Sequence, residues 1–166
     1  HYHHNHYGGL EAVLKPGLEI FLPQSFPSRF KNGLKAKVVE VKGPVKIAGG
    51  LWSTGEIEGY IPEQSLIIET SRGLVIITGC SHPGVGSICR RAKRLLNKKI
   101  YLVTGGFHLG AYSRAKIRLV IDELKALGVE KIAPNHCTGS RAIRMFKKAW
   151  GDNFINLGVG NSYHID

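Results

Sequence analysis

The sequence predicts an α/β fold, because three short apolar segments in its second half each lead through a glycine-containing loop into a helical pattern. Alternating strands and helices are typical of a sheet that is covered by helices. The loops after the strands expected at 74–77, 100–103 and 131–133 carry the histidines His82, His108 and His136. Functional groups in such folds gather where strands end, so we expect these imidazoles to lie at one edge of the sheet.

The composition is that of a folded chain with one core. Of its 166 residues, 43% are hydrophobic and 21% are charged, which is ordinary for a globular protein and favours a single domain over 1–166. The apolar runs fall well below the roughly 18 residues needed to cross a bilayer, so no membrane association is expected. Three cysteines at irregular spacing indicate reduced thiols in a cytoplasm. The chain begins without Met or a leader, and we expect the N-terminal part of the domain to be missing.

The net charge of +11 points to two kinds of partner, phosphorylated small molecules and nucleic acid. The basic residues are spread along predicted helices rather than gathered in one block. The densest group is formed by Arg90, Arg91, Lys93 and Arg94, which we interpret as the solvent-facing side of a helix. A phosphorylated small molecule is therefore preferred over nucleic acid, and the oligomeric state stays open.

The first half is predicted to hold short strands and loops, since Gly and Pro interrupt it often. A short helical stretch after Leu10 should end near Pro16. The segments 66–69 and 74–77 should pair as a hairpin across the turn at 71–73. Further strands are expected at 19–22, 38–41 and 45–48.

Helices in the second half are predicted from apolar residues spaced three and four apart. The first begins at Val85 and carries Arg and Lys on its other face. The second is capped by Ser113 and ends before Gly128. The third follows Gly139, and a last strand is expected at 154–157.

A cluster of histidines opens the sequence, with His1, His3 and His6 in one short segment. Neutral imidazole is the commonest nitrogen ligand of Zn²⁺, at about 2.0 to 2.1 Å. Three ligands from one loop need remote partners, and the histidines after the strands are suited to that role. An affinity tag is the alternative interpretation, and the downstream histidine loops argue against it.

The order of these motifs resembles that of the metallo-β-lactamase superfamily, whose HxHxDH and GGL motifs are similar to residues 1–10 of this chain. The later motifs resemble the branch of 7,8-dihydropterin-6-methyl-4-(β-D-ribofuranosyl)aminobenzene-5′-phosphate synthase-like proteins. The resemblance runs from His1 to about Gly160, and it implies an αββα sandwich of which this chain is the C-terminal portion. The motifs that carry it are Gly79-Cys80-Ser81-His82-Pro83-Gly84, Gly105-Gly106-Phe107-His108-Leu109, Asn135-His136-Cys137-Thr138-Gly139 and Gly158-Val159-Gly160.

The resemblance also implies a dinuclear divalent metal site, with zinc as the first candidate. Asn5 stands at the catalytic position where the family has an aspartate. A neutral amide coordinates divalent metals weakly and cannot accept a proton from the nucleophilic water, so we expect the second ion to be weakly held. The implied ligand sets are His1, His3 and His82 for the first ion, and Asn5, His6 and His136 for the second.

His108 lies in chain order where the family supplies a carboxylate that bridges the metals. A ligand role and a catalytic contact to the substrate both stay open for it, and no other carboxylate falls in a ligand motif. Ser81 and Thr138 are candidates for binding a substrate phosphate, Thr138 with help from the following helix N-terminus. Cys137 is expected to pack as a small apolar group, because neighbouring strand residues face opposite sides.

The function that the resemblance implies is a metal-dependent hydrolase, or a pterin-transferring synthase. Such an enzyme would act on a phosphorylated small molecule or a pterin-type substrate through a metal-bound water. A catalytically impaired, metal-binding remnant is the first alternative, because of Asn5 and the missing first half of the fold. A nucleic-acid-processing protein is the second, because of the net charge.

Overall fold

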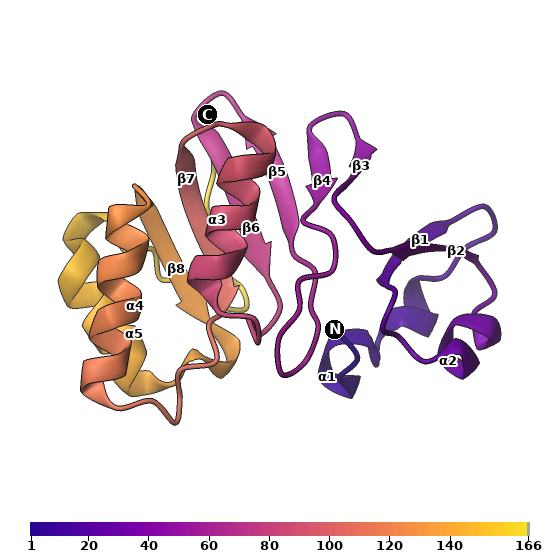
Figure 1. The fold of residues 1–166 in the computed structure, drawn as a ribbon, viewed down its shortest axis with the longest axis horizontal. Coiled ribbons are helices and arrows are strands. Elements are labelled where there is room, and N and C mark those ends of the chain that lie inside the picture. The colour runs from indigo at the N-terminus through magenta and orange to yellow at the C-terminus, as the bar shows by residue number, and fades with distance from the viewer. Residues whose placement is uncertain (166) are drawn as a thin grey trace.

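The computed structural model describes residues 1–165, which form a six-stranded mixed sheet covered by helices, together with a small second sheet (Figure 1). This arrangement confirms the mixed α/β class that the sequence predicts. In chain order the elements are α1 (His4–Tyr7), a 3₁₀ turn (Leu10–Val13), β1 (Glu19–Pro23), α2 (Ser28–Gly33), β2 (Lys37–Val41), β3 (Val45–Ala48), β4 (Leu51–Ser53), β5 (Leu66–Thr70), β6 (Gly73–Thr78), α3 (Val85–Leu96), β7 (Ile100–Gly106), α4 (Arg114–Ala126), β8 (Lys131–Asn135), a 3₁₀ turn (His136–Thr138), α5 (Ser140–Trp150) and a 3₁₀ turn (Gly151–Asn153).

The large sheet has the strand order β3-β4-β5-β6-β7-β8. Its first four strands pair antiparallel, whereas β6, β7 and β8 run parallel to one another. The predicted hairpin is confirmed, with Thr70 opposite Gly73 at its turn. Because β6, β7 and β8 are parallel neighbours, they end at the same edge of the sheet, and the histidine loops start there as the sequence predicts.

Helices α3, α4 and α5 lie on one face of the large sheet (Figure 1). Each contributes a fully buried residue to a continuous core, namely Ile88, Ile117 and Phe146. Ser113 caps α4 by accepting a 3.3 Å hydrogen bond from the N–H of Lys116, as predicted. No helix within residues 1–165 is long and apolar enough to cross a bilayer.

The opposite face of the sheet is covered in part by the C-terminal segment, whose apolar side chains pack on β6, β7 and β8. The strand predicted at 154–157 is wrong, since Phe154 forms only an isolated parallel bridge with Ile132. The N–H of Ile155 still donates to Ile132, but the N–H of Leu157 donates back to the carbonyl of Ile155. This tight turn leads the backbone away from β8, so no ladder can form.

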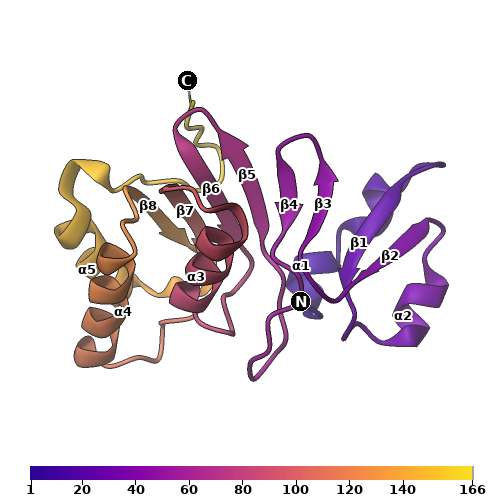
Figure 2. The ribbon, with the colours of Figure 1, turned by 45° about the horizontal axis from the view of Figure 1, so that its top comes forward.

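Residues 1–41 form a smaller unit beside β3 and β4 (Figure 2). Strands β1 and β2 are present where the sequence predicts strands, and they pair in parallel. Helix α2 between them is an addition to the prediction, because six residues are too few to show helical periodicity. The rings of Phe26 and Phe30 lie 5.4 Å apart, and Phe30 also contacts Tyr7, so aromatic packing joins α2 to the histidine segment.

The end of β7 should not tolerate a side chain at Gly105, where φ is +122° and an added Cβ would lie 2.2 Å from the carbonyl oxygen of Thr78. We expect Gly105→Ala to lower the free energy of unfolding by about 3 kcal/mol, because it strains the backbone and pushes β6 and β7 apart. Urea denaturation measures the change. Gly158→Ala is the matched control, since no atom lies within 4 Å of its added carbon. Equal effects of the two substitutions would contradict this explanation.

Candidate metal centre

Each loop that follows β6, β7 or β8 holds one residue in the left-handed backbone region. The φ angle is 62° at Ser81, 50° at His108 and 50° at His136. Residues other than glycine adopt this conformation seldom, and such residues cluster at functional sites. The three loops therefore turn sharply at the strand ends, and two of their histidines, His82 and His136, lie against the N-terminal segment.

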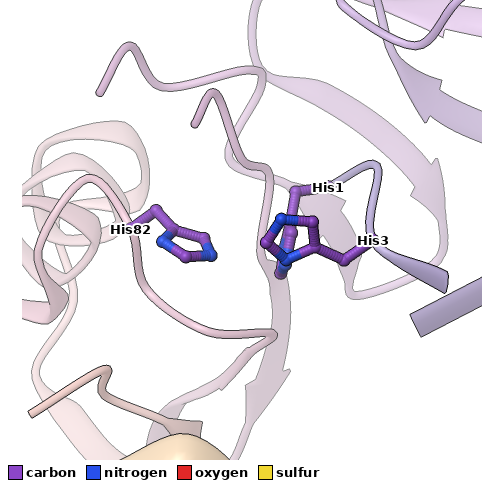
Figure 3. A group of neighbouring side chains, drawn as sticks. All are labelled: His1, His3 and His82. Carbon is purple, nitrogen blue, oxygen red and sulfur yellow. The ribbon is translucent and has the colours of Figure 1, made fainter. Parts of the chain in front are cut away.

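His1, His3 and His82 converge on one point (Figure 3). One ligand nitrogen of each lies within 4.8 Å of the other two. The centroid of the His1 ring is 4.7 Å from that of His3 and 4.8 Å from that of His82. The structure therefore brings together the three residues that the family resemblance assigns to one metal ion.

The residues of the second implied set lie beside the first. The rings of His6 and His136 are 5.0 Å apart, and the side-chain nitrogen of Asn5 is 3.4 Å from Nε2 of His136. The His6 ring also lies 4.2 Å from the His1 ring. All three side chains are exposed, unlike His1, so the second set borders the solvent.

Burial favours the neutral form of two candidate ligands, His6 and His82. It lowers the pKa of His6, with a further contribution from the nearby His136. It also lowers the pKa of His82, with His108 as the next cause. A metal ion competes with a proton for the same nitrogen, so a lowered pKa extends metal binding to more acidic solutions.

Two buried nitrogens of the first set have no hydrogen-bond partner among residues 1–165, namely Nδ1 of His1 and Nε2 of His82. Oε2 of Glu63 lies 3.3 Å from the former, but the geometry is not that of a hydrogen bond. Leaving a buried polar atom without a partner costs about 1 to 3 kcal/mol, so such atoms are rare in folded proteins. Two orphaned nitrogens beside a third imidazole are a donor set that fits a divalent metal ion.

Glu63 is the site residue that the sequence did not reveal. It is fully buried in the loop between β4 and β5, and its carboxylate accepts hydrogen bonds of 2.9 to 3.1 Å from the four consecutive backbone N–H groups of residues 79–82. The same carboxylate lies beside the His1 ring. One side chain thus fixes the loop that carries His82 and adjoins another candidate ligand. Its partners are backbone groups, which leave no mark in a sequence motif.

Cys80 lies between the two histidine sets, with its Sγ 3.2 Å from Nε2 of His6. Burial raises the pKa of Cys80 to about 12, helped by a hydrogen bond with Cys137, so without a metal the thiol is not a nucleophile at neutral pH. Cys137, which the sequence predicts to pack as a small apolar group, is only partly buried and directs its thiol at a backbone carbonyl. The 3₁₀ turn at His136–Thr138 breaks the strand alternation, and the Cys137 thiol faces the carbonyl of Cys80 at 3.7 Å.

The other residues predicted from the sequence are His108, Ser81 and Thr138, which lie beside the histidine sets. His108 is exposed, with its ring 4.3 Å from that of His82, so both roles considered for it stay open. Ser81 and Thr138 are buried, and their hydroxyls donate to the carbonyls of Gly106 and Asn135, each at 2.6 Å. These bonds give both hydroxyls a structural role, and their contact to a phosphate stays a prediction.

The fold matches that of a solved protein described as a metal-dependent hydrolase of the β-lactamase superfamily. The TM-score is 0.69 and the sequence identity 30%, over 79% of this chain and 59% of that one. The 7,8-dihydropterin-6-methyl-4-(β-D-ribofuranosyl)-aminobenzene-5′-phosphate synthase of Methanocaldococcus jannaschii is 30% identical, over 96% of this chain and 71% of its own length. The chain belongs to the metallo-β-lactamase superfamily, in the branch of this synthase.

Other comparisons add less. An uncharacterised protein of Methanocaldococcus jannaschii is 35% identical over 52% of this chain and 32% of its own length. A search of protein-family profiles finds no match. The alignment with the synthase extends over 210 residues, more than the 166 of this chain, so parts of the synthase have no counterpart here.

The carboxylate of Glu63 should be required for both stability and metal binding. We expect Glu63→Gln to lower the free energy of unfolding by about 3 kcal/mol, because an amide nitrogen would then face backbone N–H groups that need an acceptor. Chemical denaturation and zinc titration measure the two effects. Glu58→Gln, at an exposed position in the same loop, is the matched control and should change neither. Equal stability of the two variants would show that the four hydrogen bonds contribute nothing.

Proposed function

We propose that this protein is a metal-dependent enzyme that binds a divalent ion between His1, His3 and His82, with zinc as the first candidate. The observation that carries the proposal is the convergence of three imidazoles that include two buried nitrogens without a partner in the described chain. The description of the solved relative as a metal-dependent hydrolase supports it. The second histidine set, beside the first, supports a second ion.

The chemistry proposed is hydrolysis or transfer at a phosphoryl or acyl group. A divalent ion supplies a Lewis acid there and lowers the pKa of a water that it binds. His108 is exposed next to His82, where it can exchange a proton with a substrate. Asn5 cannot take up a proton as an aspartate would, which predicts slow turnover.

The proposed substrate is a small phosphorylated or pterin-type molecule. A cavity of about 390 Å³ adjoins the histidines and is lined by His1, His6, Tyr7, Leu22 and Phe26, among others. Its aromatic and aliphatic walls suit a flat ring, and two histidines belong to the same lining. The name of the synthase relative describes a dihydropterin compound with a phosphate, which fits such a pocket.

Substitution of a first-set histidine should remove the metal and the activity together. We expect His82→Ala to lower bound zinc, measured by elemental analysis, and to reduce hydrolysis of a chromogenic phosphodiester by about 100-fold or more, because one of three ligands is lost. His164→Ala makes the same change at an exposed position and should leave both unchanged. Equal zinc content in the two variants would overturn the proposed metal site.

Restoring a carboxylate at position 5 should raise activity. We expect Asn5→Asp to increase phosphodiester turnover by about tenfold or more, since a carboxylate both binds a divalent ion and accepts a proton. Steady-state kinetics with zinc in excess measures the effect. If wild type and Asn5→Asp both bind zinc and neither turns over any phosphoester, the chain is a metal-binding remnant.

A further inference from the structure

Four side chains next to the first histidine set form a cluster of two imidazoles and two thiols. Sγ of Cys80 is 3.2 Å from Nε2 of His6, and the ligand atoms of Cys80, His136 and Cys137 all lie within 4.8 Å of one another. The segments that supply them are the N-terminal helix α1 and the loops after β6 and β8. Three separate parts of the chain therefore bring this cluster together.

Cys80 connects the two parts of the cluster, because among the described residues His6 shares a group of candidate ligands with Cys80 but not with His136 or Cys137. Zinc–sulfur bonds of about 2.3 Å and zinc–nitrogen bonds of about 2.0 to 2.1 Å place neighbouring ligand atoms about 3.5 Å apart. The separation of 3.2 Å between Cys80 and His6 needs only a small adjustment to reach that value. Two thiolates with two imidazoles are a common donor set for structural zinc.

Gly106 makes this approach possible. A Cβ at this position would lie 2.7 Å from Sγ of Cys137 and 3.1 Å from Cδ2 of His136. Because β7 has no side chain at that point, the turn after β8 can pack closely against the loop that follows β6. The thiol of Cys137 thus faces the backbone carbonyl of Cys80, at 3.7 Å.

The charge of a divalent ion favours thiolates over the Asn5 amide as ligands. The amide is neutral, and the buried carboxylate nearby, that of Glu63, is already occupied by four backbone N–H groups. Two thiolates would balance the two positive charges of a divalent ion, whereas Asn5 with two neutral imidazoles would leave both uncompensated. Among the groups of candidate ligands within residues 1–165, Cys80 belongs to three of four, so it lies at the centre of the cluster.

We propose that His6, Cys80, His136 and Cys137 bind the second metal ion as a site with two thiolates, and that Asn5 is not a ligand. This inference rests on the proposed function only in placing a second ion beside the first. Binding replaces the proton of each thiol by a metal–sulfur bond, and both protons pass to the solvent. The donor set favours zinc and other metals with affinity for sulfur over magnesium or calcium.

Cobalt(II) is the probe that tests the inference, because a cobalt–thiolate bond gives a charge-transfer band in the near ultraviolet that imidazole and amide ligands do not give. We expect the wild-type chain to show this band on titration with cobalt. Cys80→Ala should remove it and lower the number of bound cobalt ions by one, and Cys137→Ala should weaken it and raise the dissociation constant by about tenfold or more. Cys89→Ala removes a buried thiol of α3 that belongs to no group of candidate ligands among the described residues, and should change neither value.

Two further variants separate this inference from the proposed function. His82→Ala should lose the first ion and keep the thiolate band, whereas Asn5→Ala should keep both ions and the band. Cobalt bound without a charge-transfer band would overturn the thiolate site and leave the first site intact. Loss of the second ion in Asn5→Ala would also overturn it, because the amide would then be a ligand.

Discussion

The site depends on one buried interaction, the acceptance of four consecutive backbone N–H groups by the carboxylate of Glu63. The loop at 79–82 leaves β6 with Ser81 in the left-handed region, a conformation that needs outside support. The carboxylate supplies this support, because charged acceptors form the stronger hydrogen bonds. The position of His82, and with it the convergence of the first histidine set, follows from that constraint.

The same carboxylate explains how an N-terminal segment is joined to the large sheet. Glu63 belongs to the loop between β4 and β5, and its Oε2 lies 3.3 Å from Nδ1 of His1. Burying a negative charge is costly unless it is compensated, and here four backbone amides of one loop supply that compensation beside the His1 ring. A metal ion held by His1 would be surrounded by groups that orient its ligands, as is general for metal centres.

The parallel arrangement of β6, β7 and β8 determines how far apart the loops that carry the candidate ligands lie. Neighbouring strands in a sheet lie about 4.8 Å apart, so the loops that leave them can place side chains within reach of a single ion. The glycines at the end of β7 leave room for this approach, because an added Cβ at Gly105 or Gly106 would meet the backbone of β6 or of the loop that follows it. Two histidines and two cysteines from distant positions can then share one small volume.

The sequence predicted well what depends on repeated local patterns. The periodicity of α3, α4 and α5 and the hairpin of β5 and β6 follow from residues close together in the chain, and the structure confirms them. The sequence did not predict α2 and β4, because these elements contain too few residues to show a hydrophobic periodicity. The strand expected at 154–157 had the right residue types, but a tight turn at Ile155 leads it away from the sheet.

For the candidate site, the sequence by itself determined which histidines gather, because each follows a strand or belongs to a recognisable motif. Only the tertiary structure decided the positions of Glu63, Cys80 and Cys137 at the site. The partners of Glu63 are backbone amides, which any residue could supply, and the thiols meet because a 3₁₀ turn and a glycine strand end allow a close approach. Such contacts depend on distances between segments far apart in the chain, and no local pattern of residues records them.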